Sequence, residues 1–183
     1  IPMVARMQHV FIDVEAFGPP GVGRPFALGA AKFDMARGVY ERTQWLIRAP
    51  VSVGGDQSTM EWLSQQSPRV LAQMRGGLPF GQAWGEFLCF ADADDRARNT
   101  VFWADDWSDF AWLDFEARDY RFRPLRDFGS QYASSAIVAL ADPLKVYSVE
   151  KYGELVPHIA MDDATAGALD LIASLKILGR DLP

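Results

Sequence analysis

The chain has 183 residues, 49% hydrophobic and 13% aromatic, enough to bury a sizeable core in a single domain. Its net charge of −6 argues against a protein that coats nucleic acid through a broad basic face, but not against an enzyme that grips phosphates through metal ions. The single cysteine, Cys89, rules out an internal disulfide, and no stretch approaches the apolar length of a membrane span, so we expect a cytoplasmic protein that does not enter a membrane.

The first quarter of the chain predicts three antiparallel strands. A strand is expected at about 8–14, followed by a glycine- and proline-rich turn at 18–25. Two further β-like runs, at 25–34 and 38–48, are separated by the turn MARG. Short turns of this kind connect neighbouring strands that run in opposite directions, so the pattern is that of a meander.

The following segment predicts helices. Ser58 or Thr59 can cap a short helix through TMEWLSQQ, which ends at Ser67-Pro68. PRVLAQMR then predicts a second short helical turn. Apolar residues recur at helical spacing over 79–91 and predict a longer helix there.

The second half of the chain predicts a strand and helices that complete an α/β fold. A short buried strand at 100–104 precedes a helix at 106–119. A basic, polar stretch at 121–135 leads into IVALA, and the element order includes one further strand in this region. The last helix, Asp162 to Leu178, has acids in its first turn and stops at Gly179. The order predicts a mixed β-sheet flanked by helices.

The first strand carries two acids on one face. In HVFIDVEAFG (9–18), Asp13 and Glu15 share a face with aromatic rings, whereas the alternate residues form a wholly apolar face. Two carboxylates a few ångströms apart on a half-buried strand repel, and each resists ionising beside the other. Such a pair needs a reason to be present.

Two other segments bring two more acids and a histidine. Asp109 lies one turn into its helix, and HIAMDDA (158–164) places His158 five residues before Asp163. Four converging carboxylates are unfavourable without cations, whereas Mg²⁺ and Mn²⁺ prefer oxygen ligands. Two such ions about 4 Å apart can clamp the attacking and leaving oxygens of a phosphoryl displacement. The four acids therefore predict a two-metal site in which Glu15 orients the attacking water.

This arrangement resembles the DEDDh 3′–5′ exonucleases of the ribonuclease H-like fold. Three motifs of that family have counterparts: D-x-E followed by Gly, N-x-x-x-D-x-x-x-L, and H-x-A-x-x-D. The matching residues are Asp13, Glu15 and Gly18 for the first motif, Asp109 and Leu113 for the second, and His158, Ala160 and Asp163 for the third. Asp105 replaces the Asn of the second motif, a supporting position rather than a metal ligand in the family.

Two further strings are similar to a subgroup of that family. STMEWLSQQSP (58–68) resembles the T-x-x-W-W/L-x-x-Q-S segment of phage DexA-like and related small bacterial exonucleases. FWADDWSDFAWL (102–113) is similar to the WA-x-x-x-x-D string of a ribonuclease subgroup there. The resemblance spans about 8–178, which implies one exonuclease domain over 1–183.

The resemblance implies a metal-dependent 3′–5′ exonuclease that releases nucleoside 5′-monophosphates from single-stranded RNA or DNA 3′ ends, with two Mg²⁺ or Mn²⁺ ions. His158 is the expected general base, a role that suits the usual pKa of an imidazole. Phe17, Gly18 and Trp62 are candidate substrate-binding residues, because aromatic faces stack bases of any sequence. Core packing is the competing interpretation for Phe17 and Trp62. Family analogy also suggests a homodimer.

Two other functions share some of these features. A ribonuclease H-like endonuclease uses the same acids but normally lacks a histidine spaced as His158 is. A non-catalytic nucleic-acid-binding module on the exonuclease fold is the other alternative, and the intact motifs argue against it. RNA and DNA are not distinguished, since that choice depends on a contact to the 2′-hydroxyl. His9, near the start of the first strand, is predicted to be structural.

Overall fold

The computed structural model describes residues 7–49, 55–93, 98–143 and 149–183. Its centre is a five-stranded sheet with the strand order β3-β2-β1-β4-β5. The strands are β1 (Gln8–Ala16), β2 (Pro25–Asp34), β3 (Gly38–Leu46), β4 (Thr100–Ala104) and β5 (Gly129–Ala133). β1, β2 and β3 pair antiparallel, whereas β4 runs parallel to both β1 and β5. The predicted meander and mixed sheet are therefore confirmed.

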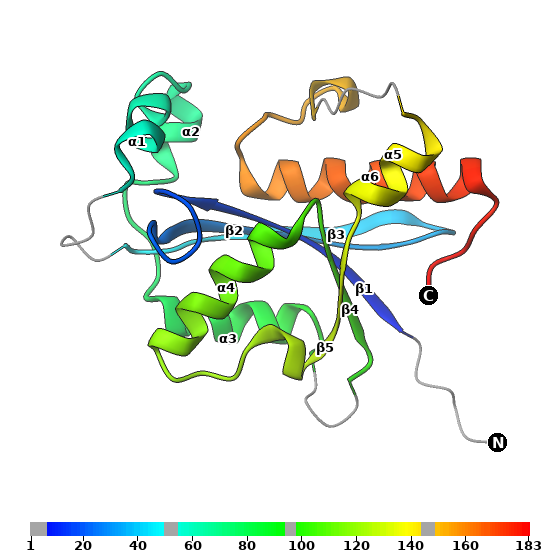
Figure 1. The fold of residues 1–183 in the computed structure, drawn as a ribbon, viewed down its shortest axis with the longest axis horizontal. Coiled ribbons are helices and arrows are strands. Elements are labelled where there is room, and N and C mark those ends of the chain that lie inside the picture. Colours follow the sequence, from blue (N-terminus) through cyan, green and yellow to red (C-terminus); the bar gives the residue numbers. More distant parts are fainter. Residues whose placement is uncertain (1–6, 50–54, 94–97, 144–148) are drawn as a thin grey trace.

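Helices cover both faces of this sheet. The helices are α1 (Gln57–Leu63), α2 (Pro68–Ala72), α3 (Phe80–Phe90), α4 (Trp107–Asp119), α5 (Ser135–Ala141) and α6 (Ala160–Leu178), with short 3₁₀ turns η1 (Leu125–Asp127) and η2 (Val149–Tyr152). α5 and α6 lie on one side of the sheet, and α3 and α4 lie on the other (Figure 1). Within the described residues, no helix combines the length and apolar character needed to cross a bilayer.

The alternation of residues along β1 explains how the two layers are held. Val10, Ile12 and Val14 are buried against apolar side chains of α3 and α4. Phe11 points to the opposite face and packs with apolar residues of α6. The apolar face predicted for this strand is thus the face that packs on α3 and α4, and the face that carries the two acids looks toward α6.

The structure settles the position of one strand that the sequence left open, and it differs from one predicted helix cap. The fifth strand is β5, within the basic and polar stretch, and IVALA belongs to α5. An edge strand needs no continuous apolar run, and a five-residue apolar run does not distinguish a strand from a helix. The cap of α1 is Asp56, whose carboxylate accepts a hydrogen bond from the Thr59 N–H at 3.1 Å, rather than Ser58 or Thr59.

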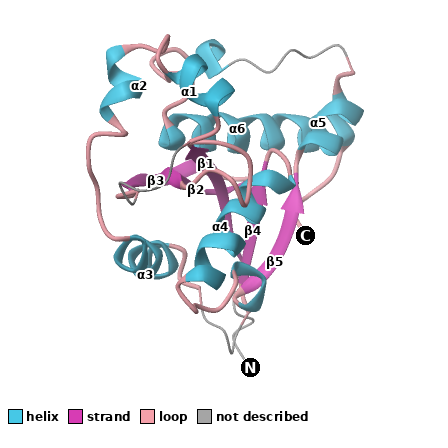
Figure 2. Ribbon diagram, turned by 60° about the vertical axis from the view of Figure 1, so that its left-hand side comes forward, coloured by secondary structure: helices cyan, strands magenta, loops and turns pink. Residues whose placement is uncertain are grey.

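Other boundaries agree with the sequence. Ser67 caps α2 by accepting a hydrogen bond from Val70 N, and Pro68 occupies the first turn of that helix. α6 ends where a glycine was expected to stop it, because Gly179 adopts the left-handed conformation with φ of 61°. α6 lies across β1 and β2, as Figure 2 shows. That placement positions the candidate site.

Candidate active site

A close contact between backbones brings the start of α6 onto the sheet beside Asp13. Asp13 pairs across the antiparallel ladder with Gly29 of β2. A Cβ atom at Gly29 would lie 1.9 Å from the carbonyl oxygen of Ala160, the first residue of α6. Only glycine allows this approach. The first turn of α6, which carries Asp163, therefore rests directly next to the strand that carries Asp13 and Glu15.

α4 supplies the third acid from the opposite side of β1. The pairing of β1 with β4 ends at Phe11, so the N–H of Val14 has no partner on β4. Asp109, buried in the first turn of α4, accepts a hydrogen bond from this N–H at 2.8 Å. The bond holds the Asp109 carboxylate against the backbone between the two acids of β1.

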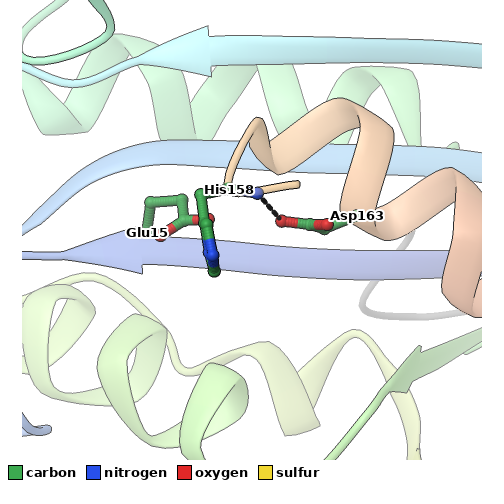
Figure 3. Close-up of side chains that lie close together, drawn as sticks. All are labelled: Glu15, His158 and Asp163. Carbon is green, nitrogen blue, oxygen red and sulfur yellow. Dashed lines mark hydrogen bonds and ion pairs between the residues drawn. The ribbon is translucent and has the colours of Figure 1, made fainter. Parts of the chain in front are cut away.

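The loop before α6 brings His158 to the same place. The His158 N–H donates a hydrogen bond of 2.7 Å to Asp163 Oδ2, and its Nδ1 lies 3.9 Å from Glu15 Oε1 (Figure 3). One ligand atom from each of Glu15, His158 and Asp163 lies within 4.8 Å of the others. The three segments predicted to form the site therefore do converge.

Burial and mutual repulsion make ionisation of the four acids costly. Burial, followed by the charges of Glu15, Asp109 and Asp163, raises the pKa of Asp13 well above its usual value. Burial raises the pKa of Glu15 to about 8, of Asp109 to about 8 and of Asp163 to about 7, with neighbouring carboxylates adding to each shift. A cluster of this kind is a candidate functional site.

The donor set fits hard divalent cations. Asp13 Oδ2 is buried and has no hydrogen-bond partner among the residues that the structure describes. A buried carboxylate oxygen without a donor is costly unless a cation or proton satisfies it. Carboxylate oxygens from β1, α4 and α6 are the ligands that Mg²⁺ and Mn²⁺ prefer.

Asp105, which stands where the family motif has Asn, lies beside the cluster. It follows β4, accepts a hydrogen bond from the Ser134 hydroxyl at 3.3 Å, and its pKa is raised to about 6 by burial. Its charge also raises the pKa of Asp13 and of Asp163. An Asn would add no charge here, so this position makes the site more acidic than the family pattern requires.

The candidate substrate-binding residues lie at the margin of the site. Phe17 is half-buried and packs on Phe26, with ring centroids 4.7 Å apart. The Gly18 carbonyl accepts a hydrogen bond from the Trp112 indole at 2.9 Å. Trp62 is 39% exposed, and its ring stands perpendicular to the His158 ring at 4.6 Å. Core packing therefore accounts for the buried part of the Phe17 side chain, whereas Trp62 contacts His158 at the edge of the site.

His9 lies apart from this group. It is buried near the start of β1, and its Nδ1 accepts a hydrogen bond from the Trp103 indole at 3.2 Å. Burial lowers the pKa of its imidazole, which favours the neutral form that can accept this bond. These contacts agree with the structural role predicted for it.

Three polar residues that were not among the predicted site residues hold the loop before α6 or the first turn of that helix. Gln73 contacts the backbone at His158 and Ala160, and Gln44 contacts the backbone of Met161.

The buried Asp162 accepts a hydrogen bond from Val156 N at 3.0 Å. Its carboxylate also pairs with two arginines, Arg42 at 3.3 Å and Arg69 at 3.7 Å. Only Asp162 belongs to a recognisable motif, as the first acid of the DD pair.

Comparisons with known proteins identify the family and the fold. The model of the family described as the 3'-5' exoribonuclease Rv2179c-like domain matches residues 8–171. No curated protein matches the chain. The closer likeness to phage DexA-like exonucleases stays a prediction.

Solved structures with the same fold include several nucleases. The nuclease domain of 3'hExo, a DEDDh family member bound to rAMP, is 14% identical with a TM-score of 0.66, covering 94% of each chain. A 3'-exonuclease that recognises the 3' end of a histone mRNA stem-loop is 12% identical with a TM-score of 0.68, over 95% of this chain and 84% of that one. E. coli Exonuclease I bound to a dT13 oligonucleotide is 14% identical with a TM-score of 0.71, over 95% of this chain and 42% of that one.

Proposed function

Because the chain belongs to the family of the 3'-5' exoribonuclease Rv2179c-like domain and is a 3′–5′ exonuclease, we propose that it releases nucleoside 5′-monophosphates from single-stranded 3′ ends by a two-metal mechanism. The observation that carries this proposal is the convergence of four carboxylates from β1, α4 and α6. One of them, Asp13, has a buried oxygen that lacks a hydrogen-bond partner among the described residues. Membership of this family implies divalent metal ions.

Four residues would hold these ions: Asp13, Glu15, Asp109 and Asp163. When bound, two Mg²⁺ or Mn²⁺ ions would supply positive charge to the attacking and leaving oxygens of an in-line displacement. The rest of the chemistry falls to side chains. Glu15 is 13% exposed at its side chain, so one of its oxygens can reach a water molecule and orient it toward the scissile phosphorus.

His158 would accept the proton of that water. Burial lowers the pKa of its imidazole, so the ring is neutral at pH 7 and able to take a proton. Nδ1 faces Glu15 at 3.9 Å, which places this atom toward the water that Glu15 orients. The side chain is 43% exposed, so the accepted proton can pass to solvent.

The substrate would enter from the exposed side of His158. Trp62 offers an exposed aromatic face beside that ring, where a base near the 3′ end can stack. Stacking tolerates every base, so we expect little base preference. The neighbours include a nuclease bound to rAMP and one bound to dT13, whereas the family description names exoribonucleases and favours RNA.

The test is digestion of 5′-labelled single-stranded RNA and DNA with Mg²⁺, Mn²⁺ or EDTA. We expect a ladder that shortens from the 3′ end, 5′-monophosphate products and no reaction in EDTA. Glu15→Gln should be inactive, whereas Glu86→Gln, which changes an exposed acid on α3, should be fully active. Cleavage of a circular strand would show an endonuclease, and binding without any product would show a non-catalytic module.

A further inference from the structure

Gln73, which follows α2, is a buried polar side chain that bridges the loop before α6. It is only 3% exposed. Its Nε2 donates a hydrogen bond of 2.6 Å to the His158 carbonyl, and its Oε1 accepts a longer one of 3.4 Å from Ala160 N. A carbonyl can only accept and an N–H can only donate, so these two partners fix the orientation of the amide.

The His158 backbone has a conformation that requires such support. Its φ is +62°, in the left-handed region that residues other than glycine occupy only when surrounding contacts compensate for the strain. Side chains hold both of its peptide groups: Asp163 accepts from its N–H at 2.7 Å, and Gln73 donates to its carbonyl. The bond to Gln73 is the one that involves none of the four acids.

We propose that Gln73 is a positioning residue for His158. By holding the carbonyl, Gln73 keeps the left-handed turn that points Nδ1 of the imidazole toward Glu15. Trp62, from the same α1–α2 segment, packs on the imidazole ring itself. This inference rests on the proposed function, because Gln73 acts on the reaction only if His158 is the base.

A second glutamine provides a matched control. Gln44 on β3 accepts a hydrogen bond of 3.4 Å from Met161 N, in the same first turn of α6. It makes no hydrogen bond to His158 among the contacts of the described residues. Gln44→Met therefore removes an acceptor from the start of α6 without releasing the His158 carbonyl, whereas Gln73→Met does both.

Kinetics on 5′-labelled single-stranded RNA test the inference. Gln73→Met should lower kcat by about 10- to 100-fold, since small displacements of a reacting group cost this much, with KM within about twofold. For Gln44→Met, kcat and KM should each stay within about twofold of the wild-type values. In a His158→Ala background, Gln73→Met should cost less than about twofold, because no imidazole remains to be misplaced. An equal loss in both backgrounds would overturn the inference.

Hydrogen–deuterium exchange gives a second result that needs neither metal nor substrate. Residues 156–160 should exchange faster in Gln73→Met than in the wild type, and Gln44→Met should leave them unchanged. If Gln73→Met does not fold, Gln73→Asn keeps a buried amide but is one methylene too short to reach the His158 carbonyl. Full activity of the Gln73 variants with an inactive His158→Ala overturns this inference alone. Full activity of His158→Ala overturns the proposed base.

Discussion

Replacing Glu15 with Gln should stabilise the metal-free protein by an amount that grows with pH. Burial, followed by the charge of Asp163, raises the pKa of Glu15 from 4.5 to about 8 in the folded chain. Between these pH values the unfolded chain has released this proton and the folded chain still holds it, so the free energy of unfolding falls as pH rises. At about 1.4 kcal/mol per pKa unit, ionisation of Glu15 costs the folded state about 5 kcal/mol by pH 8.

Thermal melts of EDTA-treated protein at pH 5 and pH 8 measure this cost. A neutral glutamine of the same shape avoids it, so Glu15→Gln should raise the melting temperature by roughly 10–20 °C at pH 8 and by roughly 2 °C at pH 5. Glu86→Gln, an exposed acid on α3, should change neither value. An equal shift at both pH values, or a lower melting temperature of Glu15→Gln than of the wild type at pH 8, would show that ionisation of Glu15 does not destabilise the folded state.

Four further predictions concern the acids of the site, His158 and the contact of α6 with the sheet. Asp13→Ala should abolish cleavage on product gels while circular dichroism shows an intact fold. Near wild-type turnover of this variant would refute the assignment of Asp13 as a metal ligand. Mn²⁺ should raise the melting temperature of the wild type by mass action and raise that of Asp13→Ala much less. His158→Ala should lower kcat by roughly 10²–10⁴-fold and keep Mn²⁺ binding in calorimetry. Gly29→Ala should destabilise the fold by more than about 3 kcal/mol in denaturant melts, because its Cβ would collide with the Ala160 backbone.

The features that were predicted from the sequence have local signatures. The alternation along β1 gave both the apolar face and the pair of acids, because side chains on a strand alternate with a period of two. The spacing around His158 and Asp163 depends on one helix start and one loop, so it can be read without the fold. The same holds for the stop of α6 at Gly179, which follows from the conformational freedom of glycine.

The features that were missed depend on contacts between distant segments. Gln73 lies 85 residues from His158, and Gln44 lies 117 residues from Met161, so no pattern along the chain links them. The need for glycine at position 29 comes from the contact with α6, a segment about 130 residues away in the chain, so no local pattern indicates it. The position of β5 was left open for a related reason: its pairing with β4, rather than its own composition, makes it a strand.

The packing of α6 on β1 has a consequence during protein synthesis. Asp13 and Glu15 are translated well before Asp163 and the helix that covers Phe11. Until α6 has been translated, the acids of β1 face no partner helix and the left-handed turn at His158 has no Asp163 to hold it. A nascent chain that ends before α6 therefore lacks one of the four acids of the site, and the site can assemble only after this helix has been translated.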